Sequence, residues 1–311
     1  MNTDREIVII GGGVAGLSAA QYAARASLNT LVIEEMAAGG QSLLINDLEN
    51  YPGFDAPVSG IELSQKMEKQ ARAFGAEFLS TTVTALKKEG DIFHVETKKG
   101  TITSLAVILA TGAKHRHLDI PGEEEFSGRG VSYCATCDGP FFRNKKILVV
   151  GGGDAACDEA MFLSKLTDKL VMVHRRDRFR AQKSLADRVL KNKRIDVRFN
   201  TTAKEIKGTN QVEKVVLTRT DTGEEYEEAF DAVFVFVGSI PQTALVPDLP
   251  KDEAGYVITD QGMATEMPGL YIAGDLRATP FRQIVVAAAD GAIASHMAAG
   301  YIDDLKGQAY E

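Results

Sequence analysis

Two cysteines separated by two residues, Cys134 and Cys137, have the spacing for redox chemistry. The sulfurs of a C-x-x-C pair can close a small disulfide ring, and its first thiolate is often stabilised by its surroundings. A structural zinc site is the alternative, but it needs four ligands. The remaining cysteine, Cys157, lies in a predicted helix, where we expect a buried apolar role, and the histidines lack finger-like spacing. We therefore interpret the pair as redox-active, with no metal.

Asp138 directly follows the pair. Thiol–disulfide exchange needs a group that gives and takes a proton at the leaving sulfur. Asp138 is the candidate for this acid–base role, although Asp138-Gly139-Pro140 is also typical of a turn. Both roles can coexist. The predicted catalytic residues are Cys134, Cys137 and Asp138.

Two glycine-rich segments are candidates for binding dinucleotides. Gly11–Gly16 follows the apolar run Ile7–Ile10, and Gly151–Ala156 follows the apolar run Ile147–Val150. Each segment leads into an alanine-rich stretch that predicts a helix. The predicted helices run from Leu17 to Ala26 and from Cys157 to Leu166. The repeat therefore predicts two strand–turn–helix units of the kind that the G-x-G-x-x-G/A pattern requires.

Glycines serve such a turn because backbone amides can approach a pyrophosphate with no side chain in the way. The helix N-terminus then supplies free N–H groups and a partial positive charge. One such turn can be purely structural, but two in this context predict two nucleotide sites. The predicted contacts in the first turn are Gly11, Gly13, Ala15 and Gly16, and those in the second are Gly151, Gly153, Asp154 and Ala155.

The end of the next strand distinguishes the two ligands. Glu34 and His174 occupy equivalent positions, the same number of residues after the first glycine of each turn. An acid there accepts hydrogen bonds from ribose hydroxyls, whereas a nearby arginine accommodates a 2′-phosphate. Glu34 therefore predicts a free ribose, as in FAD. Arg175, Arg176 and Arg180 predict NADPH at the second site, and a solvated basic face is the alternative.

Length and composition set the frame for these sites. A chain of 311 residues exceeds the usual size of one core, and 44% apolar with 25% charged residues is ordinary for a globular protein. A net charge of -8 argues against nucleic acid as a partner. The first apolar run is too short for a signal peptide, and no uninterrupted apolar stretch is long enough to cross a membrane. We expect a cytoplasmic protein.

The predicted fold class is α/β, with two Rossmann-like, three-layer nucleotide-binding domains. The nicotinamide domain, 115–245, is predicted to be inserted into a discontinuous FAD domain, 1–114 and 246–311. A buried strand pattern ending at Thr111 and Gly112 predicts the first domain edge. Asp275, after a second buried strand and Gly274, is well placed to bind the ribityl and phosphate part of a flavin nucleotide.

Over essentially its whole length the sequence resembles the bacterial low-molecular-weight thioredoxin reductases. The motifs that carry the resemblance are Gly11–Gly16, Gly39-Gly40-Gln41, Cys134–Gly139, His174–Asp177 and Gly274-Asp275. The resemblance implies that Cys137 faces the flavin, that Cys134 attacks thioredoxin and that Asp138 is the acid–base residue. It further implies a swinging nicotinamide domain and a homodimer. The residues expected to line the FAD site are Glu35, Gly40, Gln41, Asn50, Thr111, Gly112, Asp275, Arg282 and Gln283.

Two other functions remain open at this level. A flavoenzyme of the same fold could use another electron donor or acceptor, as a ferredoxin-linked reductase, a peroxiredoxin-reducing enzyme or a dithiol oxidase does. The arginine cluster favours NADPH as the electron donor. The sequence shows no added thioredoxin-like domain, which argues against a self-contained peroxiredoxin reductase. A nucleotide-binding regulatory protein without turnover is the second alternative, and the retained C-x-x-C pair argues against it. Pro140 precedes Phe141 and Phe142, whereas some thioredoxin reductases have another aromatic residue in this loop, which is expected to meet thioredoxin.

Overall fold

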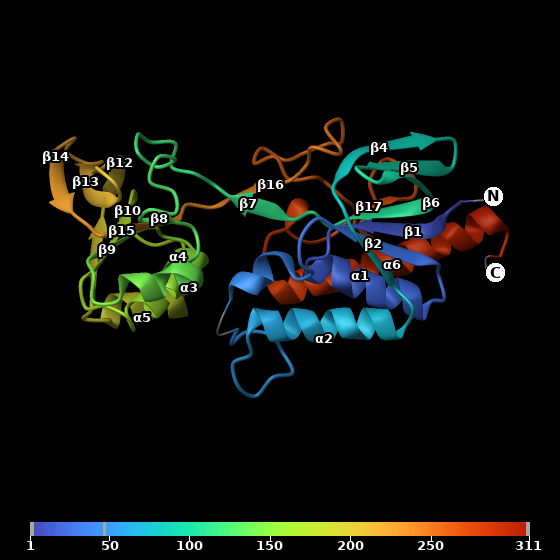
Figure 1. Cartoon of the computed structure of the whole chain (residues 1–311), viewed down its shortest axis with the longest axis horizontal. Helices are drawn as coiled ribbons and strands as arrows, with labels where there is room; N and C mark the ends of the chain where they lie inside the picture. Colours follow the sequence, from blue (N-terminus) through green and yellow to red (C-terminus); the bar gives the residue numbers. More distant parts are fainter. Residues whose placement is uncertain (1–2, 46–47, 309–311) are drawn as a thin grey trace. The chain divides into compact units, whose positions relative to one another are not determined.

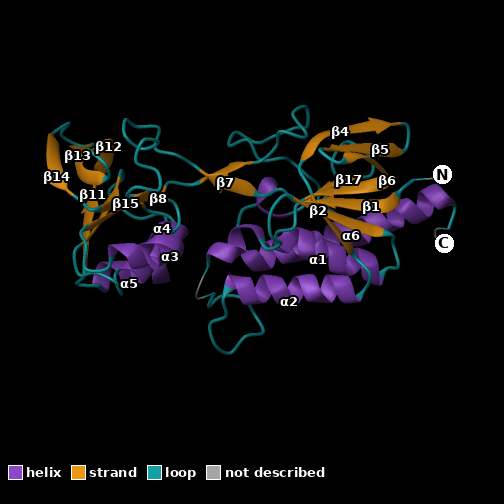
Figure 2. Ribbon diagram, viewed as in Figure 1, coloured by secondary structure: helices purple, strands orange, loops and turns teal. Residues whose placement is uncertain are grey.

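The computed structural model describes residues 3–45 and 48–308 and separates the chain into two compact units. The first unit is formed by the chain up to Lys114 and from Ile240 onward, and the second is formed by His115–Ser239. Each unit contains a parallel sheet with helices packed on it (Figures 1 and 2). The predicted α/β fold, with one nucleotide-binding unit interrupting the other, is confirmed.

A seven-stranded sheet forms the centre of the first unit. Five strands, in the order β3-β2-β1-β6-β17, pair in parallel, and β5 and β4 continue from β6 in antiparallel pairing. The strands are β1 (Arg5–Ile10), β2 (Thr30–Glu34), β3 (Glu77–Ser80), β4 (Val83–Glu89), β5 (Ile92–Thr97), β6 (Gly100–Leu109) and β17 (Leu270–Ile272). The carboxyl ends of the parallel strands meet at one edge, where α/β sheets bind their ligands.

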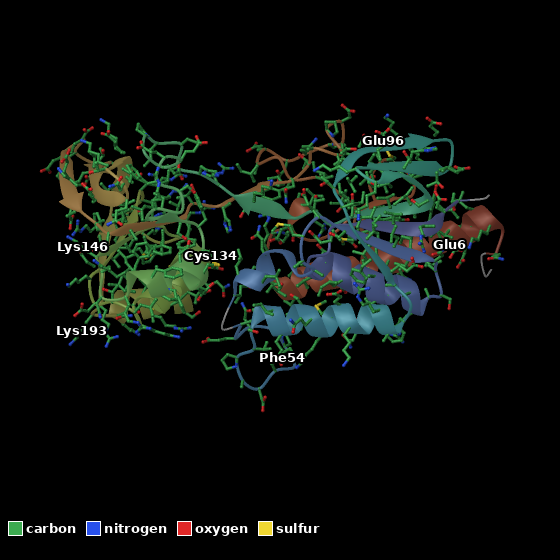
Figure 3. The ribbon with its side chains drawn as sticks, viewed as in Figure 1. Glu6, Phe54, Glu96, Cys134, Lys146 and Lys193 are labelled. Carbon is green, nitrogen blue, oxygen red and sulfur yellow. A yellow bond between two sulfur atoms is a disulfide. The ribbon has the colours of Figure 1, made fainter. Side chains whose placement is uncertain are left out.

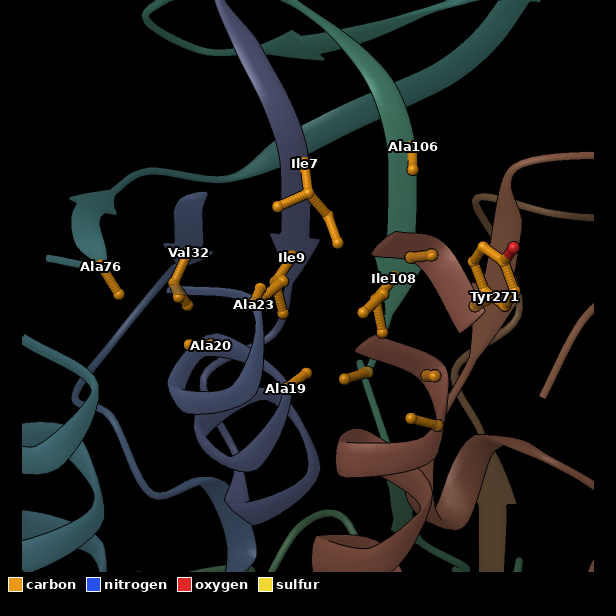
Figure 4. Close-up of a cluster of buried hydrophobic side chains, with 14 of the residues drawn as sticks. Ile7, Ile9, Ala19, Ala20, Ala23, Val32, Ala76, Ala106, Ile108 and Tyr271 are labelled. Carbon is orange, nitrogen blue, oxygen red and sulfur yellow. The ribbon is translucent and has the colours of Figure 1, made fainter. Parts of the chain in front are cut away.

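Three helices cover one face of this sheet (Figure 1). They are α1 (Val14–Arg25), α2 (Gly60–Ala73) and α6 (Ile284–Lys306), and the short 3-10 helices are η1 (Gly40–Leu44) and η3 (Gly274–Leu276). Side chains alternate along each strand, so Ile7 and Ile9 of β1 pack toward α1 while Val8 and Ile10 pack on the opposite face. Figure 4 shows Ile7 and Ile9 above Ala19 and Ala23 of α1.

Helices α1 and α6 pack at very short range. A Cβ atom on Gly291 of α6 would lie 2.0 Å from the carbonyl oxygen of Ala15 in α1. By length and composition alone α6 could cross a membrane. Its contacts, however, are with α1, β6 and β17 of the folded unit, and its Asp290 is buried in an ion pair with Arg277 at 3.1 Å. These contacts make α6 one of the helices packed on the sheet of the first unit.

The second unit is a smaller version of the same design. Its five-stranded parallel sheet has the order β11-β10-β9-β15-β8. The strands are β8 (Val131–Ser132), β9 (Ile147–Gly151), β10 (Leu170–His174), β11 (Ile195–Phe199) and β15 (Ala232–Phe236), and a separate antiparallel sheet contains β12 (Thr201–Gly208), β13 (Val212–Arg219) and β14 (Glu225–Ala229). This antiparallel sheet covers one face of the parallel sheet of the same unit.

The opposite face of the parallel sheet carries the helices of the second unit (Figure 1). They are α3 (Ala135–Asp138), α4 (Asp154–Leu163) and α5 (Lys183–Lys191), with the 3-10 helix η2 (Gly139–Phe142) after α3. The two chain segments that join the units, β7 (Ala113–His115) and β16 (Ser239–Pro241), pair with each other as a two-stranded ribbon. The redox loop and the second glycine turn therefore belong to one compact unit.

Helices α1 and α4 begin earlier than the sequence predicts, at Val14 and Asp154. The physical reason is the third glycine of each turn. Gly13 and Gly153 have extended backbones and act as the N-cap residues, so the residue after each is already helical. The glycine turn and the helix N-terminus are therefore one continuous structure.

The close packing of α1 on α6 generates a stability test. We expect Gly291→Ala to lower the free energy of unfolding by about 1–3 kcal/mol, because the new methyl group meets backbone atoms that cannot turn away. Gly300→Ala is the matched control in the same helix. A Cβ atom there meets nothing within 4 Å, so this variant should be as stable as the parent or up to about 1 kcal/mol more stable. Urea unfolding of both variants measures the difference, and equal stability would contradict the packing.

Candidate active site

The two sulfurs of Cys134 and Cys137 form a disulfide at the start of α3, with the two Cα atoms 5.4 Å apart. The Cys134 Sγ atom also accepts a hydrogen bond from the backbone N–H of Cys137 at 3.1 Å, which caps α3. Cys134 is half-buried and Cys137 is exposed. Figure 3 labels Cys134 at this position. The predicted redox pair is therefore a disulfide whose first sulfur already has a hydrogen-bond donor that would also favour its thiolate.

The surroundings of the pair agree with a redox role. Asp138 ends α3, and its carboxylate makes no hydrogen bond or ion pair within residues 3–45 and 48–308. Asp138 directly follows Cys137 in the chain, and its side chain is half-buried. The third cysteine, Cys157, is fully buried in α4, and burial raises its pKa to about 12. A thiol with so high a pKa is unreactive at neutral pH.

The first glycine turn links β1 to α1, and its glycines have two separate uses. Gly11 has φ +106°, and a Cβ atom on Gly16 would lie 1.9 Å from the Gly11 carbonyl oxygen, so these two positions require glycine for the turn itself. Gly13 has free space beside it, with no atom closer than 4.0 Å to a Cβ. No side chain caps α1, so the amides of its first turn are available to a phosphate.

Glu34 lies at the end of β2 against this turn. Its Oε2 atom accepts a hydrogen bond from the Gly12 N–H at 2.7 Å, and its Oε1 atom accepts one from Met36 at 3.0 Å. Each carboxylate oxygen keeps a lone pair for a ribose hydroxyl. The neighbouring Glu35 instead accepts a hydrogen bond from Thr82 at its exposed position. Glu34 is the better placed of the two acids.

Distant segments of the first unit meet around α1. A Cβ atom on Gly274 would lie 2.9 Å from the Ala15 Cβ atom, which places Gly274 and Asp275 against the first turn of α1. Burial raises the pKa of Asp275, nearby Arg282 lowers it and Asp290 raises it. The predicted site residues Ala15 and Asp275, far apart in sequence, therefore share one region.

Three further predicted flavin residues have defined partners. The Asn50 side-chain amide donates to the Gln283 side chain at 2.9 Å across 233 positions of sequence. Gln41, which follows Gly40 in η1, donates to the backbone oxygen of Ala113. These contacts fix the orientation of three side-chain amide groups within the first unit.

The last two predicted flavin residues in this region lie at the end of β6. Thr111 donates through its hydroxyl to the Gln242 backbone at 2.9 Å, and Gln242 donates back to the Thr111 carbonyl at 2.6 Å. Gly112 has φ +64° and open space beside it. Sequence reasoning missed Gln242, because no motif marks it and its reciprocal contact with Thr111 spans 131 positions.

Arg282 has an environment that points to an anionic or polar ligand. Its guanidinium lies over the Tyr256 ring at 3.6 Å from the ring centroid, and its Nε atom is buried without a hydrogen-bond partner in the described part of the chain. An arginine held in this way has unused donors. The residues of the first unit therefore fit a dinucleotide with a free ribose and a flavin head, as FAD has.

The second glycine turn repeats this geometry with different chemistry. A Cβ atom on Gly151 would lie 2.4 Å from the Phe236 carbonyl oxygen, so the turn again requires glycine, whereas Gly153 has nothing within 4 Å. No side chain caps α4. The carboxylate of Asp154, however, accepts two hydrogen bonds from Gln182, at 2.7 and 2.9 Å, and Ala155 is exposed. Asp154 thus secures the start of α5.

His174 fills the place that Glu34 fills in the first unit. A Cβ atom on Gly152 would lie 2.3 Å from its Nδ1 atom, and its Nε2 atom is buried without a hydrogen-bond partner among the described residues. Burial lowers the pKa of His174, and Arg175, Arg176 and Arg180 lower it further. The ring is therefore neutral near pH 7, and the arginines must supply the positive charge for a phosphate.

Arg175, Arg176 and Arg180 are exposed and make no ion pair with a carboxylate in the parts of the chain that the structure describes. Arg198 and Arg219 of the same unit, by contrast, do pair with carboxylates, Arg198 with Asp196 and Glu228 and Arg219 with Asp221. Three unpaired guanidinium groups at the end of β10 suit a 2′-phosphate. The second unit therefore fits NADPH better than NADH.

Comparisons with known proteins agree with this geometry. The pyridine nucleotide-disulphide oxidoreductase family matches residues 5–291. The thioredoxin reductase of Treponema pallidum (strain Nichols) is 56% identical over 306 residues, covering 98% of this chain and 100% of the relative. The crystal structure of Lactococcus lactis thioredoxin reductase superposes with a TM-score of 0.93 at 42% identity, covering 96% of this chain and 99% of that one.

A further solved structure extends the agreement. The thioredoxin reductase of T. acidophilum has a TM-score of 0.90 at 33% identity, and the match covers 98% of this chain and 100% of that chain. Similarity therefore spans both units and the redox loop, not one domain alone. The chain belongs to the pyridine nucleotide-disulphide oxidoreductase family and, within it, to the thioredoxin reductases.

Proposed function

We propose that this protein is an NADPH-dependent thioredoxin-disulfide reductase that carries FAD. One observation carries the proposal: a single chain combines the Cys134–Cys137 disulfide with two glycine turns, one beside an acid that suits a free ribose and one beside arginines that suit a phosphorylated ribose. Glu34 at the first turn suits a free ribose, and the unpaired arginines at the second suit a 2′-phosphate. A disulfide reductase works in a reducing compartment, so we place it in the cytoplasm.

We assign FAD to the first unit and NADPH to the second. Bound FAD supplies a carrier that accepts hydride from NADPH and passes an electron pair to the disulfide. The chain itself binds and orients these groups. In the first unit the α1 amides would bind a pyrophosphate, Glu34 would accept hydrogen bonds from a ribose, and Asp275 would bind the ribityl and phosphate part, with Arg282 nearby. In the second unit the α4 amides and the exposed arginines would hold the NADPH phosphates.

The thiol chemistry of the proposal needs two exchange steps. Two electrons and two protons convert the Cys134–Cys137 disulfide into a dithiol. The Cys134 thiol loses its proton to solvent, and the thiolate attacks one sulfur of a thioredoxin disulfide, which forms a mixed disulfide and releases one thioredoxin thiolate. Asp138 protonates that leaving sulfur and later takes the proton of Cys137. The Cys137 thiolate then attacks Cys134, which restores the disulfide and releases the second thioredoxin thiolate, protonated from solvent.

The exchange mechanism predicts separate effects on the two half-reactions. We expect Cys134→Ser to abolish NADPH-dependent reduction of thioredoxin, while NADPH still bleaches the flavin absorbance. Stopped-flow absorbance and insulin-coupled turnover measure the two steps. Cys157→Ala is the control, since this buried thiol lies outside the pair, and it should retain turnover. Unimpaired turnover of Cys134→Ser would rule out its assigned role.

The arginine assignment predicts a selective loss of NADPH affinity. Charge-assisted hydrogen bonds contribute about 1.5–3 kcal/mol each, so Arg175→Ala with Arg176→Ala should raise the KM for NADPH at least about tenfold and leave that for NADH nearly unchanged. Arg219→Ala removes an exposed arginine of the same unit that pairs with Asp221, and it should change neither constant. Equal losses for both nucleotides would show that the two arginines contact something other than the 2′-phosphate.

We also propose that the enzyme is a homodimer formed through the first unit. Helices α1, α2 and α6 border an open groove of about 830 Å³, lined by Tyr22, Tyr51, Phe54, Met67 and Val285 among other largely apolar side chains. Tyr22 is 45% exposed and Val285 36% exposed. Contiguous exposed apolar side chains are a common mark of a protein interface. A second copy is the fitting occupant, because a C2 interface pairs a helical face with itself.

The dimer proposal is testable by molecular mass. We expect sedimentation velocity to give twice the chain mass for the parent protein, and the chain mass for Tyr22→Glu, which puts a charge into the groove. Ile258→Glu is the control, since Ile258 is 50% exposed in the same unit and does not line the groove. A monomeric parent, or a fully dimeric Tyr22→Glu, would contradict the proposal.

A further inference from the structure

The residue immediately before the redox pair, Tyr133, has its hydroxyl group held on two sides. Its Oη atom lies 2.8 Å from the Glu123 Oε1 atom and 2.7 Å from the His117 Nδ1 atom. The Glu123 side chain is only 3% exposed. Its two oxygens also accept the backbone N–H groups of Leu118 and Asp119, at 2.8 and 2.7 Å. A buried carboxylate therefore organises this loop.

The direction of the hydrogen bonds follows from these partners. A carboxylate only accepts, so Tyr133 donates to Glu123, and its oxygen is left to accept from His117. His117 donates from Nδ1 either as the neutral tautomer protonated there or as the imidazolium. Burial, followed by the Glu123 hydrogen bond, raises the pKa of Tyr133, so the phenol keeps its proton. The two hydrogen bonds therefore have one direction: His117 donates to Tyr133, and Tyr133 donates to Glu123.

Ring packing adds to this restraint. The Tyr133 ring meets the edge of the His117 ring at 4.8 Å between centroids and stacks on His115 at 6.2 Å and 17°. Burial, and then nearby His117, lowers the pKa of His115, which keeps that ring neutral. His115 is the last residue of β7, and His117 follows it by two residues. Tyr133 is therefore held between the start of the second unit and its redox loop.

The restraint on Tyr133 passes directly to Cys134. The Ser132 hydroxyl accepts the Cys134 N–H at 3.1 Å and donates to the Cys134 carbonyl at 3.2 Å. Strand β8 fixes Ser132 by pairing with β15. With Tyr133 held by its side chain and Ser132 by its backbone, the main chain at Cys134 has little freedom. This main chain sets the distance from the Cys134 Sγ atom to the Cys137 N–H.

We propose that Tyr133 is a positioning residue of the redox pair, acting through Glu123 and His117 to keep the Cys134 sulfur within hydrogen-bond distance of the Cys137 amide. After reduction, that amide favours the Cys134 thiolate. The proposal rests on the proposed function only where it assigns the attack on thioredoxin to Cys134. The state of the thiolate is a property of the chain alone and can be measured without any substrate.

The first experiment measures the Cys134 thiol directly. The holoenzyme is reduced with dithiothreitol, desalted and labelled with iodoacetamide across a pH series, and mass spectrometry follows the Cys134 peptide. In Tyr133→Phe, which keeps the ring and removes the hydroxyl, we expect the labelling profile to move to higher pH, with about fivefold less thiolate at pH 7. Tyr226→Phe removes a hydroxyl that meets Arg198 elsewhere in the same unit, and it should match the parent.

The second experiment separates the two halves of turnover. Tyr133→Phe should lower kcat/KM for thioredoxin about fivefold while the flavin is reduced by NADPH at the parental rate. His117→Leu should reproduce a large part of this loss, and His117→Asn, whose amide can still donate to Tyr133, should restore it. If the parent enzyme fails to reduce thioredoxin, the proposed function is wrong, and the labelling profiles still decide the role of Tyr133.

A parental labelling profile in Tyr133→Phe would overturn the proposal. If this variant also has a lower melting temperature and unchanged thioredoxin kinetics, Tyr133 only stabilises the fold. A shifted profile with a melting temperature equal to that of Tyr226→Phe supports positioning.

Discussion

At two turns of this chain the backbone approaches other backbone more closely than any side chain allows. A Cβ atom on Gly16 would lie 1.9 Å from the Gly11 carbonyl oxygen, and one on Gly151 would lie 2.4 Å from that of Phe236. Each turn can therefore close tightly against its sheet, and the helix after it begins at once. No side chain caps that helix, and a Cβ atom on its N-cap glycine would have no neighbour closer than 4.0 Å, an arrangement that suits a pyrophosphate.

The same constraint lets one architecture serve two nucleotides. The side chain at the end of the next strand packs on the second glycine of each turn, as Glu34 does on Gly12 and His174 does on Gly152. In the first unit this side chain is an acceptor that suits ribose hydroxyls. In the second it is a neutral ring beside exposed arginines, which suit a 2′-phosphate. An acid at this position therefore suits a nucleotide with a free ribose, and a histidine followed by arginines suits one with a 2′-phosphate, while the fold stays the same.

The redox pair depends on a different kind of support. Its disulfide lies in a short helix that has too little length to be stable by itself. The hydroxyl of Ser132 and the buried carboxylate of Glu123 hold the loop in front of it through hydrogen bonds. Buried polar groups are favourable when every partner is satisfied, and they then specify one conformation. These polar contacts add to the apolar packing of Val131 and Ala135 on either side of Cys134.

The sequence by itself determined the features that lie within short stretches of chain: the two strand–turn–helix units, the equivalent positions of Glu34 and His174, and the spacing of the cysteines. Backbone sterics and strand periodicity act locally, so these patterns can be recognised without a structure. Only the tertiary structure brought Asn50 to Gln283, or Glu123 to Tyr133. Such contacts depend on how distant elements pack, and no local propensity encodes that packing, which is why the network beside the redox pair was missed.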